Sequence, residues 1–306
     1  RRKKMNLVKN RSEILFLYDV KDGNPNGDPI DENKPRIDEE TNKSIVTDVR
    51  LKRTIRDYLF DYKGQEIFIR EIRKDNAKLI TKEERIKDIG KDSVIQKCID
   101  LRLFGSTTAV ENQTLALTGP VQFKFGRSLH KVDLTYIKGT TVMPSGEGKE
   151  QGTFTERYIL PYSLIAFYGI INENAAKMQN IPLTEEDIEL MMEGIWNGTK
   201  NLISGTKFGQ MPRLLLQVIY KENQNFFIGE LDKYISIKTD LQDEALRDIT
   251  DLKIDLTKLI NTLKNHKDKI ESIKYKADER ANFVVEDQNI SISEAFKDFK
   301  TQEFVF

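Results

Sequence analysis

Two short segments with apolar centres constrain the fold of this chain more than any other feature. They are Glu13–Val20 (EILFLYDV) and Arg213–Tyr220 (RLLLQVIY), which lie far apart in the sequence. Short runs of aliphatic, β-branched and aromatic residues bounded by turn residues are typical of buried strands. We therefore predict a buried strand at the first segment and a central strand at the second.

Amphipathic helices are predicted between these strands. The first begins at Thr47 or Asp48, either of which can cap it, and Leu51 and Ile55 start its apolar stripe. The second begins at Thr184 and carries three carboxylates in its first turn, where they favour the helix dipole. Two further strand patterns, at Leu117–Leu129 and Leu164–Ile171, lie between the helices, so the order is strand, helix, strand, strand, helix, strand. This order predicts an α+β, ferredoxin-like fold, which is also the architecture of RNA-recognition domains.

Long insertions interrupt this pattern. We predict a single elaborated domain over residues 1–306, with an insertion at 63–110 and a projecting β-hairpin at 131–158. Within the first insertion, Glu66–Arg73 has a strand pattern and Asp75–Lys97 is charge-dense and helical.

The region after the central strand shows two further patterns. Phe226–Ile237 is predicted to pair antiparallel with that strand. Asp243–Ile270 has apolar residues at helical spacing and is predicted to form one long amphipathic helix.

Composition narrows the function. The chain has 306 residues with 49 Lys and Arg against 49 Asp and Glu, so any nucleic-acid binding must depend on local charge. A single cysteine, Cys98, excludes an internal disulfide framework, and His130 and His266 are too isolated for a histidine-based metal site or catalytic triad. The longest apolar stretch, Ile159–Ile171, is too short to span a bilayer. We expect a cytoplasmic protein without a cofactor.

The turn-rich segment Asp22–Asn33 has some, but not all, of the features of a metal-binding loop. It begins like an EF-hand loop, but Asn33 occupies the twelfth position, where that loop needs a bidentate Glu. Its aspartates could hold magnesium loosely, or they could form Asx turns that satisfy the loop backbone. These aspartates are Asp22, Asp28 and Asp31.

Cations gather in the first turns of the first helix. They oppose the helix dipole, and a bound polyanion would reverse that cost because cations and backbone N–H groups would converge on phosphate. Lys52 and Arg56 lie on one stripe of this helix. The alternative is a solvated charged face. The four cations are Arg50, Lys52, Arg53 and Arg56.

A second loop, Leu202–Gln210, combines glycines that allow close approach to a ligand with Lys207 for charge and Phe208 for stacking. It could equally be a plain strand-entry loop. The predicted hairpin carries Met143 and Phe154 near its tip, where they could wedge between bases or contact a neighbouring subunit.

Three motifs together resemble a known family. They are DGNPNGDP (Asp22–Pro29), VTDVRLKRTIR (Val46–Arg56) and KFGQMPRLLL (Lys207–Leu216). The combination closely resembles the backbone subunit of Cascade, the CRISPR-associated RNA-guided surveillance complex. That subunit belongs to the RAMP superfamily, and the likeness is greatest to the type I branch, subtype I-B.

The resemblance implies an RNA-recognition-like palm, a finger at 63–110 and a thumb at 131–158. Copies of such a subunit polymerise along one guide RNA (crRNA) beside other Cascade subunits, and the target DNA strand pairs with that guide. The thumb pushes between bases, with Met143 or Phe154 as the wedge here. The residues carried over as RNA-binding are Arg50, Lys52, Arg53, Arg56, Arg127, Ser204, Gly205, Lys207, Phe208, Gln210 and Arg213.

Two other functions stay open. Related backbone subunits of type III complexes cut target RNA with an aspartate in the loop after the first strand, where Asp22, Asp28 and Asp31 lie. The type I resemblance argues against this, so we predict no catalytic activity. The other alternative is a protein-interaction scaffold built on Asp243–Ile270.

Overall fold

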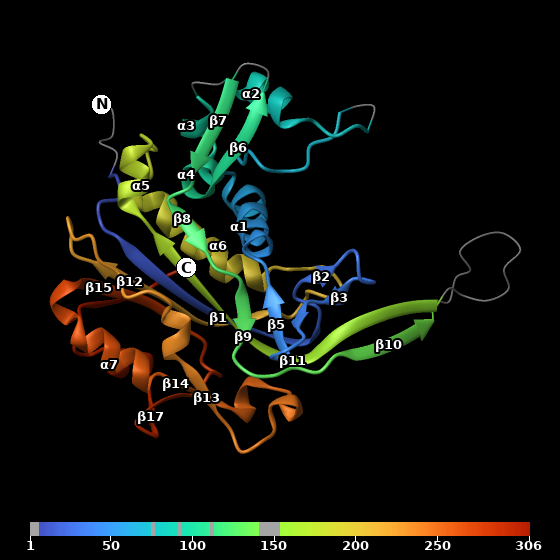
Figure 1. Cartoon of the computed structure of the whole chain (residues 1–306), viewed down its shortest axis with the longest axis vertical. Helices are drawn as coiled ribbons and strands as arrows, with labels where there is room; N and C mark the ends of the chain where they lie inside the picture. Colours follow the sequence, from blue (N-terminus) through green and yellow to red (C-terminus); the bar gives the residue numbers. More distant parts are fainter. Residues whose placement is uncertain (1–5, 75–76, 91–92, 111–112, 141–153) are drawn as a thin grey trace, which may run out of the picture.

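The computed structural model describes residues 6–74, 77–90, 93–110, 113–140 and 154–306. Within these ranges, a ten-stranded sheet runs through the centre and is covered on both faces (Figure 1). Helices pack on one face, and an irregular C-terminal region with a smaller sheet packs on the other. The chain is thus an α+β protein, as the sequence predicts.

The sheet is built around β1, which pairs antiparallel with β11 on one side and β12 on the other. Two further strands, β8 (Val121–Phe123) and β10 (Thr135–Thr140), also pair with β11. The main path of the sheet, from edge to edge, is β18 (Thr301–Glu303), β15 (Ile270–Ala277), β12 (Met211–Tyr220), β1 (Ser12–Gly23), β11 (Phe154–Ile171), β9 (Gly126–Ser128), β5 (Lys43–Val46) and β4 (Ile37–Asp38).

Both predicted core strands are confirmed. Every residue of β1 from Ser12 to Val20 is buried, and β12 is buried over most of its length. Alternate side chains of β1 enter two different cores: Phe16 packs toward the helices, and Leu15 and Leu17 pack toward the C-terminal region. A strand with apolar residues on both faces must be covered on both, which accounts for the three-layered arrangement.

The two long helices begin where the sequence predicts. Thr47 caps α1 (Asp48–Lys63), and its side chain accepts a hydrogen bond from the Arg50 N–H. Thr184 caps α6 (Glu185–Lys200) through a reciprocal capping box with Asp187. A short helix, α5 (Glu173–Met178), precedes α6. Of the described helices, none combines the length and the apolar character that a bilayer crossing requires.

Two glycines of α6 allow it to lie close against α1. A β-carbon at Gly194 would come 3.2 Å from Ile55 Cγ2, and one at Gly198 would come 3.1 Å from the Thr54 carbonyl oxygen. Larger residues at these positions would push the helices apart. The N-terminal turns of α1 and the C-terminal end of α6 are therefore held near each other.

The expected long helix at Asp243–Ile270 is wrong. Only α7 (Thr257–Asn265) is α-helical there, and the rest crosses the second face of the sheet in short 3-10 turns and one short strand, burying Leu246, Ile249 and Leu252. Asp251 accepts hydrogen bonds from the backbone N–H groups of Arg247 and Asp248, a local arrangement that competes with a helix. The other elements of this layer, in which η denotes a 3-10 helix, are η1 (Leu231–Tyr234), β13 (Ser236–Lys238), η2 (Asp243–Ala245), η3 (Ile249–Asp251), β14 (Lys253–Asp255), η4 (Lys267–Lys269), β16 (Phe283–Val285), β17 (Gln288–Ile290) and α8 (Ile292–Ala295).

The predicted pairing of Phe226–Ile237 with β12 is also wrong, because β15 occupies that edge. The buried Glu13 carboxylate accepts hydrogen bonds from the backbone N–H groups of Ile228 (2.8 Å) and Gly229 (2.6 Å). These donors are therefore bound to a side chain of β1 instead of a neighbouring strand.

An outlying part of the chain follows α1. It contains α2 (Lys82–Ile89), α3 (Val94–Lys97), α4 (Ile99–Phe104) and the hairpin of β6 (Gly105–Val110) and β7 (Gln113–Thr118). It has a small core of its own around Phe68, Val94 and Leu101. Helices occur where the charge-dense segment predicts them, but the strand expected at Glu66–Arg73 is wrong. That segment makes only isolated bridges, since Asp100 binds the Phe68 and Ile69 N–H groups.

A two-stranded arm projects from the sheet (Figure 1). It consists of β10 and the first residues of β11, paired from Thr135 with Ile159 to Thr140 with Phe154. The hairpin is present as predicted, and its second strand continues into the sheet, so the strand expected separately at Leu164–Ile171 is part of β11. Met143 lies outside the described residues. Phe154 begins β11, and its backbone pairs at the outer end of the arm.

Candidate nucleic-acid interface

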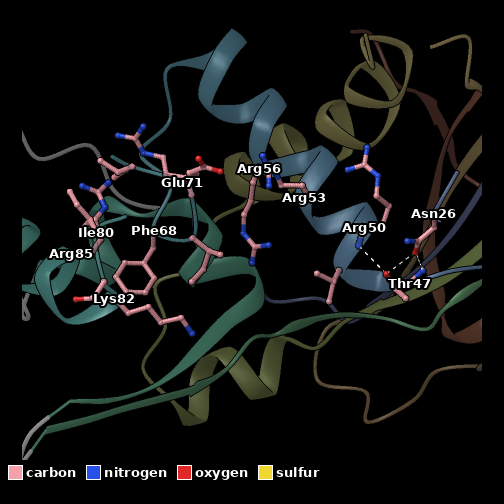
Figure 2. Close-up of a pocket in the computed structure, with 15 residues that line it drawn as sticks. Asn26, Thr47, Arg50, Arg53, Arg56, Phe68, Glu71, Ile80, Lys82 and Arg85 are labelled. Carbon is pink, nitrogen blue, oxygen red and sulfur yellow. Dashed lines mark hydrogen bonds between the residues drawn. The ribbon is translucent and has the colours of Figure 1, made fainter. Parts of the chain in front are cut away.

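Two hollows meet at the N-terminal turns of α1. The first, of about 520 Å³, lies between α1 and the outlying part of the chain (Figure 2). The second, of about 370 Å³, lies between α1 and the loop after α6. Arg50 and Arg53 line both hollows. We call the two together the α1 groove.

Arg50 and Lys207 come together in this groove from distant parts of the sequence. Both line the second hollow and are partly buried, and neither forms an ion pair with any residue that the structure describes. Burial lowers the pKa of Lys207, and the nearby Arg50 charge lowers it further. Burial likewise lowers the pKa of Arg50. Asp57 and Asp61 line the same hollow, and the Asp57 charge partly opposes the shift in the pKa of Arg50. Two partly desolvated cations without a direct ion pair form a site for an anion.

Backbone geometry at the start of α1 adds to this site. Asn26 Oδ1 accepts hydrogen bonds from the Thr47 N–H at 2.8 Å and the Thr47 hydroxyl at 3.0 Å. Thr47 in turn accepts from the Arg50 N–H, so Asn26, Thr47 and Arg50 form one chain of contacts at the end of the hollow (Figure 2). The N-terminus of a helix favours negative charge.

Lys52 and Arg56 lie on one stripe, as their spacing predicts, but that stripe faces inward. Lys52 pairs with Asp48 at 2.8 Å, and Arg56 pairs with the fully buried Asp100 at 3.0 Å. Both cations also lie over the Phe104 ring. Their charges are compensated within the fold, and Arg56 also lines the first hollow.

Arg53 is exposed, Arg127 is half-buried, and both are paired. Arg53 pairs with Asp57 one helical turn away, at 2.7 Å. Arg127, on β9, pairs with Asp38 at 2.7 Å, and this contact lowers the pKa of the Asp38 carboxyl. Exposed pairs of this kind contribute little stability, so they can exchange a carboxylate for a phosphate at small cost.

The loop after α6 lines the groove with two of its predicted residues, Ser204 and Lys207. The Ser204 carbonyl accepts hydrogen bonds from the Lys207 and Phe208 N–H groups, which closes a tight turn. Ser204, Gly205 and Phe208 are exposed, and Phe208 is 74% exposed. Gly209 has φ +84°, a conformation that favours glycine.

Like Lys52 and Arg56, Gln210 and Arg213 lie beneath the surface. Gln210 is buried, and within the described chain its Nε2 has no hydrogen-bond partner. Arg213 pairs with Asp19 at 2.9 Å and also with Asp278. Burial raises the pKa of Asp19 and Arg213 opposes that shift, so Arg213 serves as the counter-ion of a buried carboxylate.

The structure adds residues to the groove that the motifs do not single out. Arg157, on the arm, lies next to Gly205: a β-carbon at Gly205 would come 3.7 Å from Arg157 Nη1. Arg70, Lys82 and Arg85 line the far side of the first hollow. Only the docking of the arm and the outlying part against α1 brings them here, and no sequence spacing signals it.

The first loop (residues 23–36) gathers no metal-binding set. Asp28 pairs with Arg36 and Asp31 pairs with Lys34, both at 2.7 Å. Asp22 is exposed at the end of β1, with φ 49°. Across the described residues, no group of three or more His, Cys, Asp or Glu side chains is placed to hold a metal ion. The Asx-turn alternative is present at Asp28, which accepts from the Ile30 N–H.

Comparison with known proteins identifies the family. The model of the CRISPR-associated protein Cas7 family matches residues 10–257. The chain belongs to the Cas7 family. A Cas7 protein of Haloferax volcanii is 33% identical to it, over 93% of this chain and 92% of that protein. The predicted resemblance to the Cascade backbone family is confirmed, whereas subtype I-B stays a prediction.

Solved structures share the Cas7 fold seen here. One chain of a CRISPR RNA-guided surveillance complex has a TM-score of 0.53 and 13% identity, and the match covers 88% of this chain and 89% of that one. A chain of a CRISPR RNA-guided surveillance complex, pre-nicking, has a TM-score of 0.55 and 11% identity, with 96% of each chain covered. At these identities the likeness concerns the fold.

Proposed function

We propose that this Cas7-family chain is a non-enzymatic subunit that binds guide RNA through the α1 groove. Copies would polymerise along one crRNA, beside other Cascade subunits, and form the backbone of a type I surveillance complex in the cytoplasm. The target DNA strand would be read by pairing with the guide, in antiviral defence. Family membership and the fold shared with chains of RNA-guided surveillance complexes support this proposal.

One observation carries the proposal: Arg50 and Lys207 lie together, partly buried, and neither forms an ion pair with a described residue. Two like charges held together repel each other, and each has lost part of its hydration. A phosphate would relieve both effects. Contacts of this kind recognise the sugar-phosphate backbone and carry no sequence information, as a subunit that accepts any guide requires.

Strand order supports a palm of the RNA-recognition type. Neighbours in the order β12, β1, β11, β9 pair antiparallel, and α1 and α6 pack together on one face, as a ferredoxin-like unit would have them. RNA-recognition domains bind RNA on the open sheet face. Here the C-terminal region buries that face, so we place the guide at the N-terminal end of α1 instead.

The inserted parts would then act as finger and thumb. In this assignment residues 63–110 form the finger across the first hollow, and residues 131–158 form the thumb, with Met143 or Phe154 as the wedge. Direct contacts with the guide would come from residues that are exposed or only half-buried: Arg50, Arg53, Arg127, Ser204, Gly205, Lys207 and Phe208. The remaining members of the set would shape the groove from below: Lys52, Arg56, Gln210 and Arg213.

The test removes the two unpaired charges together. We expect Arg50→Ala with Lys207→Ala to weaken binding of single-stranded RNA by about 100-fold, because each loses a charge-assisted contact. The slope of log affinity against log salt should fall by about 1.4, the value for two phosphates on a single strand.

A matched control removes the same charge elsewhere. Lys264 and Lys300 are exposed on the C-terminal region, remote from the α1 groove. Lys264→Ala with Lys300→Ala should leave most of the affinity. If both double variants weaken RNA binding equally, net charge alone decides binding and the groove assignment is wrong.

A further inference from the structure

The first loop touches all three elements that the proposed function assigns to guide RNA. We propose that this loop is a brace that sets their spacing, and that Asn26 and Gly23 are positioning residues of the RNA site. This inference rests on the proposed function and adds a role for the motif that contains Asp28, which is engaged in an ion pair. Each joint of the brace is a defined contact.

The first joint fixes the start of α1. Asn26 Oδ1 accepts from both the N–H and the hydroxyl of Thr47, and Thr47 accepts from the Arg50 N–H. A rotation of the first turn of α1 would break these bonds. The position of the Arg50 backbone therefore depends on a side chain of the first loop (Figure 2).

The second joint fixes the loop that carries Lys207. The Asn24 N–H donates to the Thr206 carbonyl at 2.7 Å. Gly23 makes this approach possible, since a β-carbon there would lie 3.0 Å from the same carbonyl oxygen and 2.9 Å from Val20 Cγ1. An alanine at position 23 would push the Thr206 carbonyl away, and Lys207 with it.

The third joint reaches the arm. The Tyr158 hydroxyl donates to Glu32 at 2.9 Å, and Lys34 Nζ lies 5.2 Å from the centre of the Tyr158 ring. This hydrogen bond raises the pKa of Tyr158, whose phenol is in any case protonated at neutral pH. Arg157, which lies next to Gly205, is adjacent in sequence to this contact.

Internal contacts make the loop stiff enough to connect the joints. Its two short strands, β2 (Gly27–Asp28) and β3 (Lys34–Pro35), pair antiparallel. The buried Asn24 donates through Nδ2 to the Asn33 carbonyl at 2.6 Å. The Asp28–Arg36 pair crosses between the two ends of the loop. Asp28 of the motif thus stabilises the brace.

A brace is needed because Arg50 and Lys207 repel each other. Each is a partly buried cation, and the Arg50 charge lowers the pKa of Lys207. Without a bound anion, no attraction between the two holds them in place. Contacts elsewhere must offset the repulsion, and Asn26 and Gly23 lie at the two points where the first loop meets their segments.

The test is a pair of double-mutant cycles with the full-length chain and single-stranded RNA oligonucleotides as the probe. Asn26→Ala alone should weaken binding by about tenfold, but by less than about twofold in an Arg50→Ala background, because both changes disable the same contact. Gly23→Ala should behave in the same way with Lys207→Ala. The crossed pairs, Asn26→Ala with Lys207→Ala and Gly23→Ala with Arg50→Ala, should be additive.

This selective coupling separates positioning from loss of stability, which would weaken every background alike. Asn10→Ala is the matched control: Asn10 Nδ2 donates to the Tyr220 carbonyl at 2.7 Å, and its removal should leave RNA affinity unchanged. If Arg50→Ala and Lys207→Ala weaken binding while Asn26→Ala and Gly23→Ala do not, the brace is wrong and the proposed function stands. If Arg50→Ala and Lys207→Ala have no effect, the proposed function itself fails.

Discussion

Two groups of cations on the same motifs differ in what surrounds them. Arg213, Arg56 and Lys52 are buried, and each is paired with a carboxylate of the fold. Arg50 and Lys207 are only partly buried, and the described chain supplies them with no such partner. The first group stabilises the protein, and the second leaves a charge for something outside the chain to neutralise.

The comparison shows that residue type and spacing do not decide the role of a cation. Lys52 lies only two residues from Arg50, yet it pairs with Asp48 and packs over Phe104. Breaking a buried pair leaves an isolated charge in a low-dielectric interior. Removing an unpaired cation relieves repulsion. The two groups should therefore respond to mutation in opposite ways: loss of a paired cation should lower the stability of the fold, and loss of an unpaired one should lower RNA affinity.

The largest effect should come from Arg213→Ala. It leaves Asp19 buried with only the Tyr162 hydroxyl, at 3.1 Å, as a side-chain donor. We expect the free energy of unfolding to fall by about 3–5 kcal/mol, measured by urea denaturation. The pKa of Asp19 should rise further above its usual value, as a carboxyl ¹³C titration would show. A variant as stable as the wild type would remove the distinction between the two groups.

Arg56→Ala should destabilise less, by about 1–3 kcal/mol. Its partner Asp100 keeps two backbone donors, the Phe68 N–H at 2.8 Å and the Ile69 N–H at 3.0 Å. These bonds continue to stabilise the carboxylate when the guanidinium is gone. Urea denaturation of both variants measures these two losses of unfolding free energy. A larger loss for Arg56→Ala than for Arg213→Ala would contradict the prediction.

Lys207 should make RNA binding depend on alkaline pH. Its pKa lies below the usual 10.5 in the free protein, and a bound phosphate would raise it. Binding should therefore take up a fraction of a proton per subunit as the pH approaches 10.5, and affinity should fall across that range. Calorimetry in buffers of different ionisation enthalpy measures the uptake. Lys207→Ala should abolish it, and uptake that persists in this variant would argue against Lys207 as the source.

The free protein should show the opposite trend in stability. Between the lowered pKa of Lys207 and 10.5, the unfolded chain binds more protons than the folded chain. The contribution of Lys207 to the free energy of unfolding therefore rises with pH in this window. The difference between wild type and Lys207→Ala in thermal melts at two alkaline pH values would show the sign.

The smallest effect should come from the exposed pair of Arg53 and Asp57. Asp57→Ala should change the free energy of unfolding by only about 0.3–0.5 kcal/mol, as for other helix pairs one turn apart. RNA affinity should not fall, because the variant frees Arg53 for phosphate. A marked loss of affinity in Asp57→Ala would mean that the pair itself shapes the groove.

Much of the framework could be predicted from local patterns. The strands around Phe16 and Leu215 are apolar enough to be recognised, and Thr47 and Thr184 cap their helices through bonds within four residues. The segment around Leu246 and Ile249 could not be predicted in the same way, because its apolar spacing fits a helix equally well. Its actual path follows the face of the sheet that it covers.

The sequence by itself determined the core strands, the capped helices and the clustering of cations in the motifs, because each depends on side chains a few residues apart. Only the tertiary structure decided which cations remain unpaired. Asp100, Asp278 and Thr206 are distant in sequence from the residues they contact, and whether a charge is compensated depends on such long-range neighbours. The energy of a charge depends on its distance from other charges and on its burial, and both are set by the three-dimensional structure and not by position in the sequence.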